Sequence, residues 1–299
     1  MRRGPLMPVS TLGRSDRVRG LWLRPMRQPA ELSPADADLA SAAAERVVTT
    51  HRRLAEFLKA GLTLARIDAF IAIQLADLGC RSCFLGYRVP KSPPFPSHAC
   101  LSLNECIVHG TAGYHTAPIV PGDLLKIDVG VVYRGWIGDA AWTYSFGEPT
   151  PEVRRLMDVG KESLRRGVLE LRPGNTYIQW ARTVQGYAEG ECGFHLARGL
   201  GGHGYGRHLH TPPYISNVVP TWPGEWPDAH APCEPGTLVA VEPMIAIGTG
   251  KTVQAAREWP IRTADGSMSV HYEHDVLITD RGPRILTHGL EDLPDVMAG

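Results

Sequence analysis

Hydrophobic positions recur at helical spacing in four segments of the chain. The first follows Ser33-Pro34, which suit an N-cap and a first helical residue, and precedes Gly61, which can end a helix. We therefore expect a helix from this cap to about Lys59. The same spacing predicts three more helices, over residues 64–78, 150–171 and 176–189.

Four apolar runs with the character of strands lie between and after the helical pairs. They cover residues 124–133, 136–145, 237–248 and 269–278. The order of helices, strands, helices and strands predicts an α+β domain, with an antiparallel sheet and helices stacked on one side. Two proline-rich stretches, residues 90–99 and 218–236, are predicted as surface loops.

Composition narrows the class of protein. The 299 residues are 43% hydrophobic, which suffices for a large core, and no run of 18 apolar residues predicts a transmembrane helix. The net charge of +0 gives no bulk reason to expect a nucleic-acid or membrane partner. Of six cysteines, only Cys80 and Cys83 have the CxxC spacing, so reduced thiols in a cytoplasmic protein are the favoured interpretation.

The N-terminal segment departs from this average. Residues 1–30 contain seven arginines, four prolines and one acid, Asp16, without apolar periodicity. We expect residues 1–32 to form a flexible basic arm before a single domain over residues 33–299. A solvated tail, a transit peptide, a start codon assigned too early and a contact with ribosomal RNA all fit this composition, whereas a secretory signal would need an apolar centre.

A hairpin is predicted where two strand-like runs meet at Arg134-Gly135. With these two residues as the turn, Asp128 and Asp139 lie diagonally on the same face of the hairpin. An unpaired carboxylate in the middle of an apolar strand is costly, and a metal cation is one remedy. A buried arginine or a different turn register are the alternatives that the hairpin leaves open.

Two further acids, Glu242 and Glu273, interrupt apolar strands. Single acids in strands usually face solvent. Together with the two aspartates and the histidines of residues 203–210, however, they form an oxygen-rich set that suits two divalent metals. The GxGxxG spacing at residues 199–204 opens no convincing helix and has no ribose-binding acid about 20 residues on, so a nucleotide site is rejected.

Five motifs in order carry a resemblance to a known family. They are SLNECIVHG, KIDVGVVYRGWIGDAAWTYS, GGHGYGRHLH, VAVEPM and WPIRTADGSMSVHYEH, and the similarity around them covers about residues 33–288. This set resembles the type I methionine aminopeptidases. The resemblance implies the α+β pita-bread fold, a site with two metals, and removal of the initiator methionine from nascent polypeptides in the cytoplasm.

The resemblance also assigns the metal ligands. It implies that Asp128 binds one ion, that Asp139 and Glu273 bridge both ions, and that His203 and Glu242 complete the shell of the other. Carboxylates with one imidazole accept cobalt, manganese, iron or zinc. Two divalent ions per chain are therefore expected.

The same resemblance places the groups that handle the substrate. His109 and His210 would flank it, with His210 donating to the peptide carbonyl and His109 bonding the scissile amide nitrogen, while Glu242 acts as general base on a water between the metals. The methionine side chain would lie in a pocket lined by the following residues: Tyr87, Cys100 and Trp259.

Three positions near the second motif histidine differ from what is usual in the family. Tyr205 stands in place of a small aliphatic residue, His208 in place of glycine and Leu209 in place of an aromatic residue. None is a predicted ligand, so these differences concern the shape of the methionine pocket.

Two other functions compete with methionine aminopeptidase activity. A proline-specific peptidase of the same fold would use the same five ligands, but such enzymes usually carry an additional N-terminal domain, and only about 32 residues precede the first helix here. A non-catalytic relative that binds peptides or ribosomes typically loses metal ligands, whereas this chain retains all five. We expect an enzyme that is monomeric and has no membrane partner.

Overall fold

The computed structural model describes residues 32–299 apart from Lys91. Helix α2 (Pro34–Phe57) begins as predicted, because Ser33 Oγ accepts from the backbone N–H of Asp36 at 3.2 Å and proline opens the first turn. It ends at Phe57 rather than near Lys59. The predicted arm lies outside the described residues except for its last residue, so its separation from the domain stays a prediction.

The three other predicted helices are confirmed. Threonine side chains cap the first two of them, with Thr63 accepting from Arg66 N and Thr150 from Val153 N. The last ends earlier than predicted and continues as a π-helical turn, η1 (Gly186–Glu191). The bounds are α3 (Leu64–Asp77), α4 (Pro151–Val168) and α5 (Tyr177–Gln185), with short 3₁₀ turns η2 (Pro227–His230) and η3 (His288–Leu290).

The predicted hairpin consists of β4 (Leu124–Tyr133) and β5 (Trp136–Phe146). Both turn residues have positive φ, 49° at Arg134 and 81° at Gly135, as a two-residue type I′ turn requires. This turn matches the twist of the strands and holds them in one register. The pairing is as predicted: Tyr133 with Trp136, Gly130 with Asp139 and Asp128 with Ala141.

The remaining strands complete four small sheets that are antiparallel apart from one pair, β16 with β5. The first sheet adds to the hairpin β1 (Arg81–Ser82), β2 (Cys100–Leu103) and β16 (Val296–Met297). The second contains β15 (Gly282–Ile285), β14 (His274–Thr279), β9 (Leu238–Val241), β7 (Gly201–Gly204) and β8 (Thr211–Ser216). The third sheet has three strands, β13 (Ser269–His271), β10 (Met244–Ala246) and β6 (His195–Leu196). The fourth also has three, β11 (Thr252–Gln254), β12 (Ile261–Thr263) and β3 (Cys106–Val108).

The prediction of two continuous strands at residues 237–248 and 269–278 was wrong. Each run is broken in the middle, and its halves enter different sheets. The first break falls at Glu242-Pro243, where proline has no N–H to continue the ladder. The second falls opposite, at Tyr272-Glu273, since Val241 is the partner of His274 on one side and Met244 the partner of His271 on the other.

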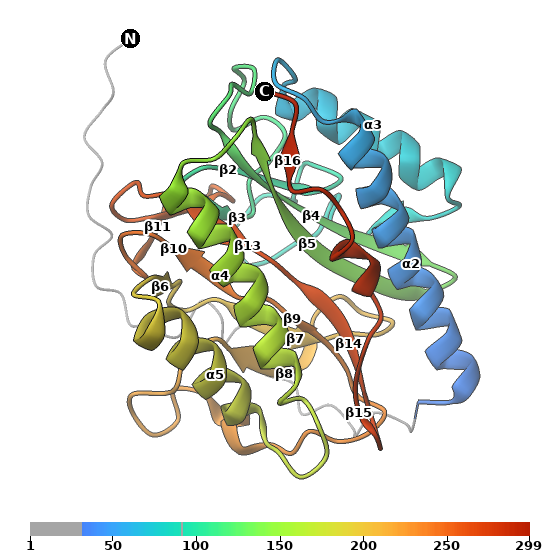
Figure 1. Ribbon diagram of the computed structural model, residues 1–299. Coiled ribbons are helices and arrows are strands. Elements are labelled where there is room, and N and C mark those ends of the chain that lie inside the picture. The colour runs from blue at the N-terminus through green and yellow to red at the C-terminus, as the bar shows by residue number, and fades with distance from the viewer. Residues whose placement is uncertain (1–31, 91) are drawn as a thin grey trace.

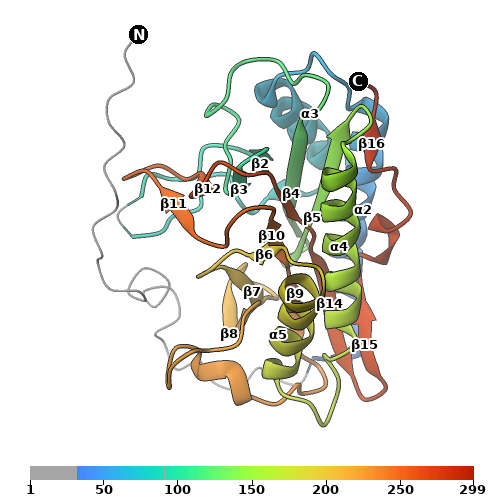
Figure 2. The ribbon, with the colours of Figure 1, turned by 60° about the vertical axis from the view of Figure 1, so that its left-hand side comes forward.

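Helix α2 lies along the β4–β5 hairpin (Figure 1), and Figure 2 shows α2 and α4 on one side of the molecule with β8, β11 and β12 toward the other. The contact of α2 with the hairpin is close, because a Cβ at Gly138 would lie 2.6 Å from the backbone carbon of Ala43. A Cβ at Gly160 of α4 would likewise meet the Tyr272 ring at 2.7 Å. The hairpin side chains predicted to be buried, Leu125, Ile127, Val129 and Val131, are fully buried.

The two proline-rich stretches are not simply surface loops. Each contributes a buried aromatic side chain: Phe95 is 3% exposed and Trp226 is 4% exposed. The Phe95 ring packs edge-on against Trp259, with centroids 5.2 Å apart. Trp226 Nε1 donates to the carbonyl of Tyr214 at 2.8 Å. These aromatic side chains attach the loops to the core that lies beneath them.

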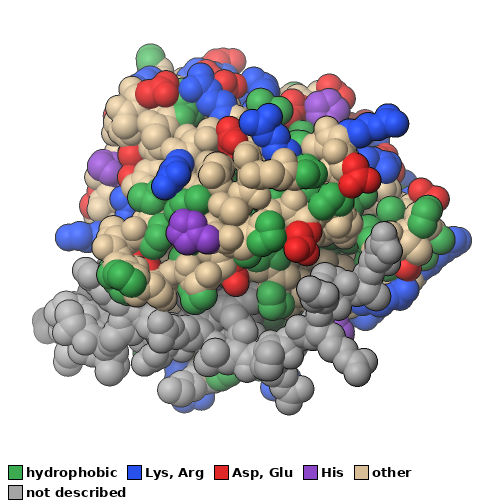
Figure 3. Space-filling model, turned by 90° about the horizontal axis from the view of Figure 1, so that it is seen from below, with side chains coloured by type: hydrophobic (Ala, Val, Ile, Leu, Met, Phe, Trp, Pro, Cys, Tyr) green, Lys and Arg blue, Asp and Glu red, His purple; other side chains and the backbone are tan. Residues whose placement is uncertain are grey.

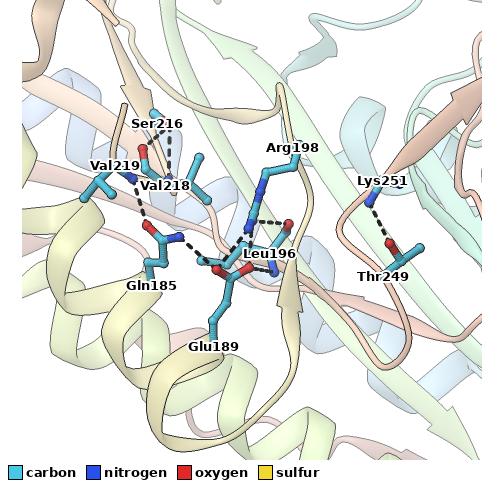
Figure 4. A network of polar contacts seen from close by, with 9 residues as sticks. All are labelled: Gln185, Glu189, Leu196, Arg198, Ser216, Val218, Val219, Thr249 and Lys251. Atoms are coloured by element: carbon cyan, nitrogen blue, oxygen red, sulfur yellow. Dashed lines mark hydrogen bonds and ion pairs between the residues drawn. The ribbon is translucent and has the colours of Figure 1, made fainter. Parts of the chain in front are cut away.

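A polar network attaches the segments on both sides of β7 and β8 to the end of α5 (Figure 4). The carboxylate of Glu189 accepts from Leu196 N at 3.0 Å, from Arg198 at 2.6 Å and from Gln185 at 2.8 Å. Gln185 Oε1 in turn accepts from Val219 N at 2.9 Å. The hairpin that carries the glycine-rich histidine stretch is therefore held at both of its flanks.

The described surface mixes charges of both signs. On the face in Figure 3, acidic and basic side chains are interspersed among apolar ones. Among the described residues, no helix has the length and apolar character needed to cross a membrane. All six cysteines lie in the described part and are unpaired thiols there.

Candidate active site

The five predicted ligands come together from separate segments of the chain. Asp128 and Asp139 lie on the same face of the β4–β5 hairpin. Glu242 and Glu273 occupy the two facing strand breaks, and His203 lies on β7 opposite Ala240 of β9, beside the first of these breaks. The backbone links the sheets here, because Glu273 N donates to Ala141 O at 2.9 Å. Residues far apart in sequence thus face one space between two sheets.

The imidazole of His203 is aimed at the acids. Its Nε2 lies 3.8 Å from Asp139 Oδ2 and 4.0 Å from Glu242 Oε1. Its Nδ1 lies 3.1 Å from the carbonyl oxygen of Gly204 and must carry the proton there, because a carbonyl only accepts. The lone pair of Nε2 therefore faces the acids, which is the tautomer that a metal ligand needs.

Burial disfavours the charged form of the four carboxylates at this site. It raises the pKa of Asp128 and of Glu242 to about 7. Burial also raises the pKa of Asp139 and of Glu273 well above the usual range, and the neighbouring acids add to this shift. Four carboxylates this close favour a bound cation, which would relieve both the repulsion and the lost hydration.

The donor groups fit divalent metal ions. The Oδ1 atoms of Asp128 and Asp139 are buried and accept no hydrogen bond from any described residue. One donor atom each from Asp139, His203 and Glu273 lie within 4.8 Å of one another, and all three residues are buried. Unsatisfied carboxylate oxygens beside a neutral imidazole nitrogen are the ligand types that transition metals of this class accept.

The two predicted substrate histidines lie beside this group. The rings of His210 and His203 are 4.4 Å apart, and His210 Nδ1 lies 2.6 Å from the hydroxyl of Tyr87. The His109 ring is 6.1 Å from Trp259. Burial lowers the pKa of His109 to about 4 and that of His210 well below its usual value, so both rings are neutral at neutral pH.

The predicted pocket residues lie around the same space. Cys100 on β2 pairs with Asp128 on β4 and is 5% exposed. Trp259 is 8% exposed, and its Nε1 donates to the carbonyl of Pro93 at 3.0 Å. Phe95, which lies in a stretch predicted as a surface loop, packs against the Trp259 indole and so borders the same apolar pocket.

The three unusual positions differ in exposure. Tyr205 and Leu209 are buried, at 5% and 7% exposure, whereas His208 is exposed. The eight positions of the histidine stretch therefore hold one buried imidazole among the acids, one beside Tyr87 and one at the surface.

Three further polar side chains, not predicted from the sequence, contact the predicted ligands. His271 Nε2 lies 3.0 Å from Glu242 Oε2. Burial lowers the pKa of His271 to about 4, and the charge of Asp128 opposes this shift. Asp275 Oδ2 accepts from the backbone N–H of Asp139 at 2.9 Å, and Asn217 Nδ2 donates to the backbone carbonyl of Glu242 at 2.8 Å. A signal for His271 and Asp275 existed, since both alternate with Glu273 and so share its direction.

Comparison with known proteins agrees with this geometry. Residues 38–280 match metallopeptidase family M24. The chain is 35% identical to methionine aminopeptidase 1 of Mycobacterium tuberculosis over 279 residues, which cover 91% of this chain and 98% of that protein. The crystal structure of the methionine aminopeptidase from Thermotoga maritima matches with a TM-score of 0.78 at 30% identity, covering 86% of this chain and 98% of that one.

A proline-specific neighbour is more distant. The X-Pro aminopeptidase of Thermotoga maritima matches with a TM-score of 0.67 at 20% identity and covers 89% of this chain but only 63% of that one. That likeness shows the common pita-bread fold, which the α+β prediction anticipated. The ordered motifs, the M24 match and the close relatives agree: this chain belongs to metallopeptidase family M24, among the methionine aminopeptidases, and its family uses divalent metal ions.

Proposed function

We propose that this chain hydrolyses the peptide bond after an N-terminal methionine, with nascent polypeptides in the cytoplasm as its substrates. One observation carries the proposal. Four carboxylates, of which Asp139 and Glu273 are buried and Asp128 and Glu242 are largely covered, converge with one correctly oriented imidazole from five segments, in a chain whose relatives over most of its length are methionine aminopeptidases. Such an arrangement is costly to fold, and bound cations would offset that cost.

We assign two divalent ions to the predicted ligands. Four carboxylates carry four negative charges when ionised, which two divalent ions balance and one does not. Cobalt, manganese, iron and zinc are all compatible with these donors. Bound ions would supply Lewis acidity and would lower the pKa of a water at the site, so that it gives up a proton more readily near neutral pH. The residues that would hold them are Asp128, Asp139, His203, Glu242 and Glu273.

Glu242 moves the proton. Its carboxylate is 12% exposed and lies among the other ligands, so it can contact a water there. As general base it accepts the proton of the attacking water and later passes that proton to the leaving amine. The amide of Asn217, which donates to the carbonyl of residue 242, holds this strand break in place.

His210 is oriented to donate a hydrogen bond. When the Tyr87 hydroxyl donates to Nδ1 across 2.6 Å, the neutral ring carries its proton on Nε2. That N–H can donate to the peptide carbonyl as negative charge develops on its oxygen. His109, against Trp259, is placed to bond the scissile amide nitrogen. Tyr87, Cys100 and Trp259 supply the apolar pocket for the methionine side chain.

The test is release of the N-terminal residue from short peptides by metal-stripped protein to which single metals are added back. We expect methionine release from Met-Gly and Met-Ala peptides, and its loss in Asp139→Ala. The matched control is Asp292→Ala, which changes an exposed acid and should keep the activity. Faster hydrolysis of Xaa-Pro peptides than of Met peptides would instead establish a proline peptidase.

A further inference from the structure

One buried imidazole at the site has no role in the five-ligand assignment. His271 is the last residue of β13 and is 2% exposed. Its Nε2 lies 3.0 Å from Glu242 Oε2 and 3.9 Å from Glu273 Oε2. It therefore faces two of the assigned ligands, and it comes from a different sheet than the one that carries His203.

The short contact of His271 with Glu242 is not a well-aligned hydrogen bond. Despite the 3.0 Å separation, Nε2 has no hydrogen-bond partner of acceptable geometry among the described residues. A buried ring nitrogen without an aligned partner costs free energy and calls for an explanation. In a centre with two neighbouring cations, ligands of the two ions approach each other closely while each points at its own cation, which would account for both the distance and the misalignment.

The site contains two donor groups rather than one. Asp139, His203 and Glu273 form the first, and Glu242, His271 and Glu273 form the second. In each group the donor atoms lie within 4.8 Å of one another, and all members are buried. The groups share Glu273, and each includes one imidazole. The carboxylate of Glu242 lies between the two rings, with Oε1 toward His203 and Oε2 toward His271.

On the basis of the two-metal function proposed above, we propose that His271 is a sixth metal ligand of this chain. In the five-ligand assignment the ion bound by Asp128 has only carboxylate ligands from the protein. His271 gives that ion an imidazole of its own, so that each of the two ions has one nitrogen ligand.

The proposal has a consequence for metal preference. Ions with purely carboxylate surroundings include manganese and magnesium, whereas imidazole favours zinc, cobalt, iron and nickel. A second imidazole therefore shifts the second position of the site toward cobalt and zinc. Replacing His271 should weaken cobalt at that position more than it weakens manganese.

The experiment counts ligated imidazoles in the cobalt-loaded full-length protein. A histidine bound to cobalt(II) through Nε2 shows a strongly shifted, exchangeable Nδ1–H proton resonance. We expect two such resonances in the wild-type protein and one in His271→Gln, which keeps a polar side chain of moderate size. Calorimetric titration of the stripped proteins with cobalt should show two tight sites in the wild type, and in the variant a second site weakened at least about 10-fold. Titration with manganese should show a smaller loss.

The matched control is His98→Gln, because His98 Nδ1 contacts Asp68 Oδ2 at 3.0 Å and is not among the predicted ligands. This substitution should leave both resonances and both metal sites unchanged. The number of shifted imidazole resonances in the wild-type protein is measured without any variant, so the test does not depend on the folding of His271→Gln. A single resonance in the wild type, or two tight cobalt sites in folded His271→Gln, would overturn the proposal.

The outcomes separate this proposal from the proposed function. Methionine release by the wild type, measured on the same cobalt-loaded sample, tests the function. Release of methionine together with a single imidazole resonance would show that His271 is not a ligand, while the proposed function would be supported. Two resonances without release of methionine establish the ligand and refute the peptidase assignment.

Discussion

Tyr87→Phe tests whether the tyrosine hydroxyl orients the catalytic imidazole. The substitution removes one oxygen, which lies 2.6 Å from His210 Nδ1, and keeps the aromatic ring. The ring stays available to the methionine pocket, so binding of the side chain should change little. Without the hydroxyl, the neutral His210 ring is no longer held in the tautomer that carries its proton on Nε2.

The size of the effect follows from the bond that is lost. A neutral hydrogen bond contributes about 0.5–1.5 kcal/mol net, and about 1.4 kcal/mol corresponds to a factor of ten in rate. We therefore expect kcat for a Met-Ala peptide to fall about 2- to 13-fold, with KM nearly constant. The fall cannot exceed that of His210→Ala, about 10²–10³ for loss of a whole donor, because the hydroxyl acts through that ring.

The assay is steady-state methionine release, measured for both single variants and for the double variant. Tyr87→Phe should have no effect once His210 is alanine, so the coupling should equal the whole effect of the single change. Tyr133→Phe is the matched control, since Tyr133 lies at the turn end of the hairpin and its hydroxyl accepts from Arg46 at 3.1 Å. Its kcat should equal that of the wild type.

Two results would refute the reasoning. A rise in KM with unchanged kcat in Tyr87→Phe would show that Tyr87 only lines the methionine pocket and does not orient His210. An undiminished effect of Tyr87→Phe in the His210→Ala background would show that the hydroxyl acts on something other than this imidazole.

Three further predictions concern the site, the fold and the arm. His210→Ala should lower kcat about 10²–10³-fold while metal content by elemental analysis stays at the wild-type level; loss of metal would make it a ligand. Gly138→Ala should lower the free energy of unfolding by about 1–3 kcal/mol, because its Cβ would meet the backbone of Ala43, whereas Gly113→Ala, with open space, should not. Deletion of residues 1–30 should reduce co-sedimentation with ribosomes at low salt; equal sedimentation would refute an arginine contact with RNA.

Local rules account for the parts of the fold that the sequence predicted well. The start of α2 depends on Ser33 and Pro34, which act on the adjacent turn. The hairpin register depends on Arg134-Gly135, since this two-residue turn with two positive φ angles matches the twist of the strands that it joins. Both features depend on neighbouring residues alone, so their chemistry is readable before the chain is folded.

The motifs identified the five predicted ligands, but they did not show that these residues converge. Glu242 and Glu273 lie in runs that have the periodicity of continuous strands. Only the folded chain shows that both runs break at these acids and that the breaks face each other between two sheets. Breaks of this kind depend on which strands pair with which, and pairing is a property of contacts between distant segments.

The sequence by itself determined the helix starts, the hairpin and the ligand types, because capping, turn geometry and ligand chemistry act within a few residues. The tertiary structure decided where the strands break, that Phe95 supports Trp259, and that His271 joins His203 beside Glu242. A histidine in an apolar strand has no signature of its own. Its chemistry depends on the side chains that the fold brings within hydrogen-bond distance, and those come from other sheets.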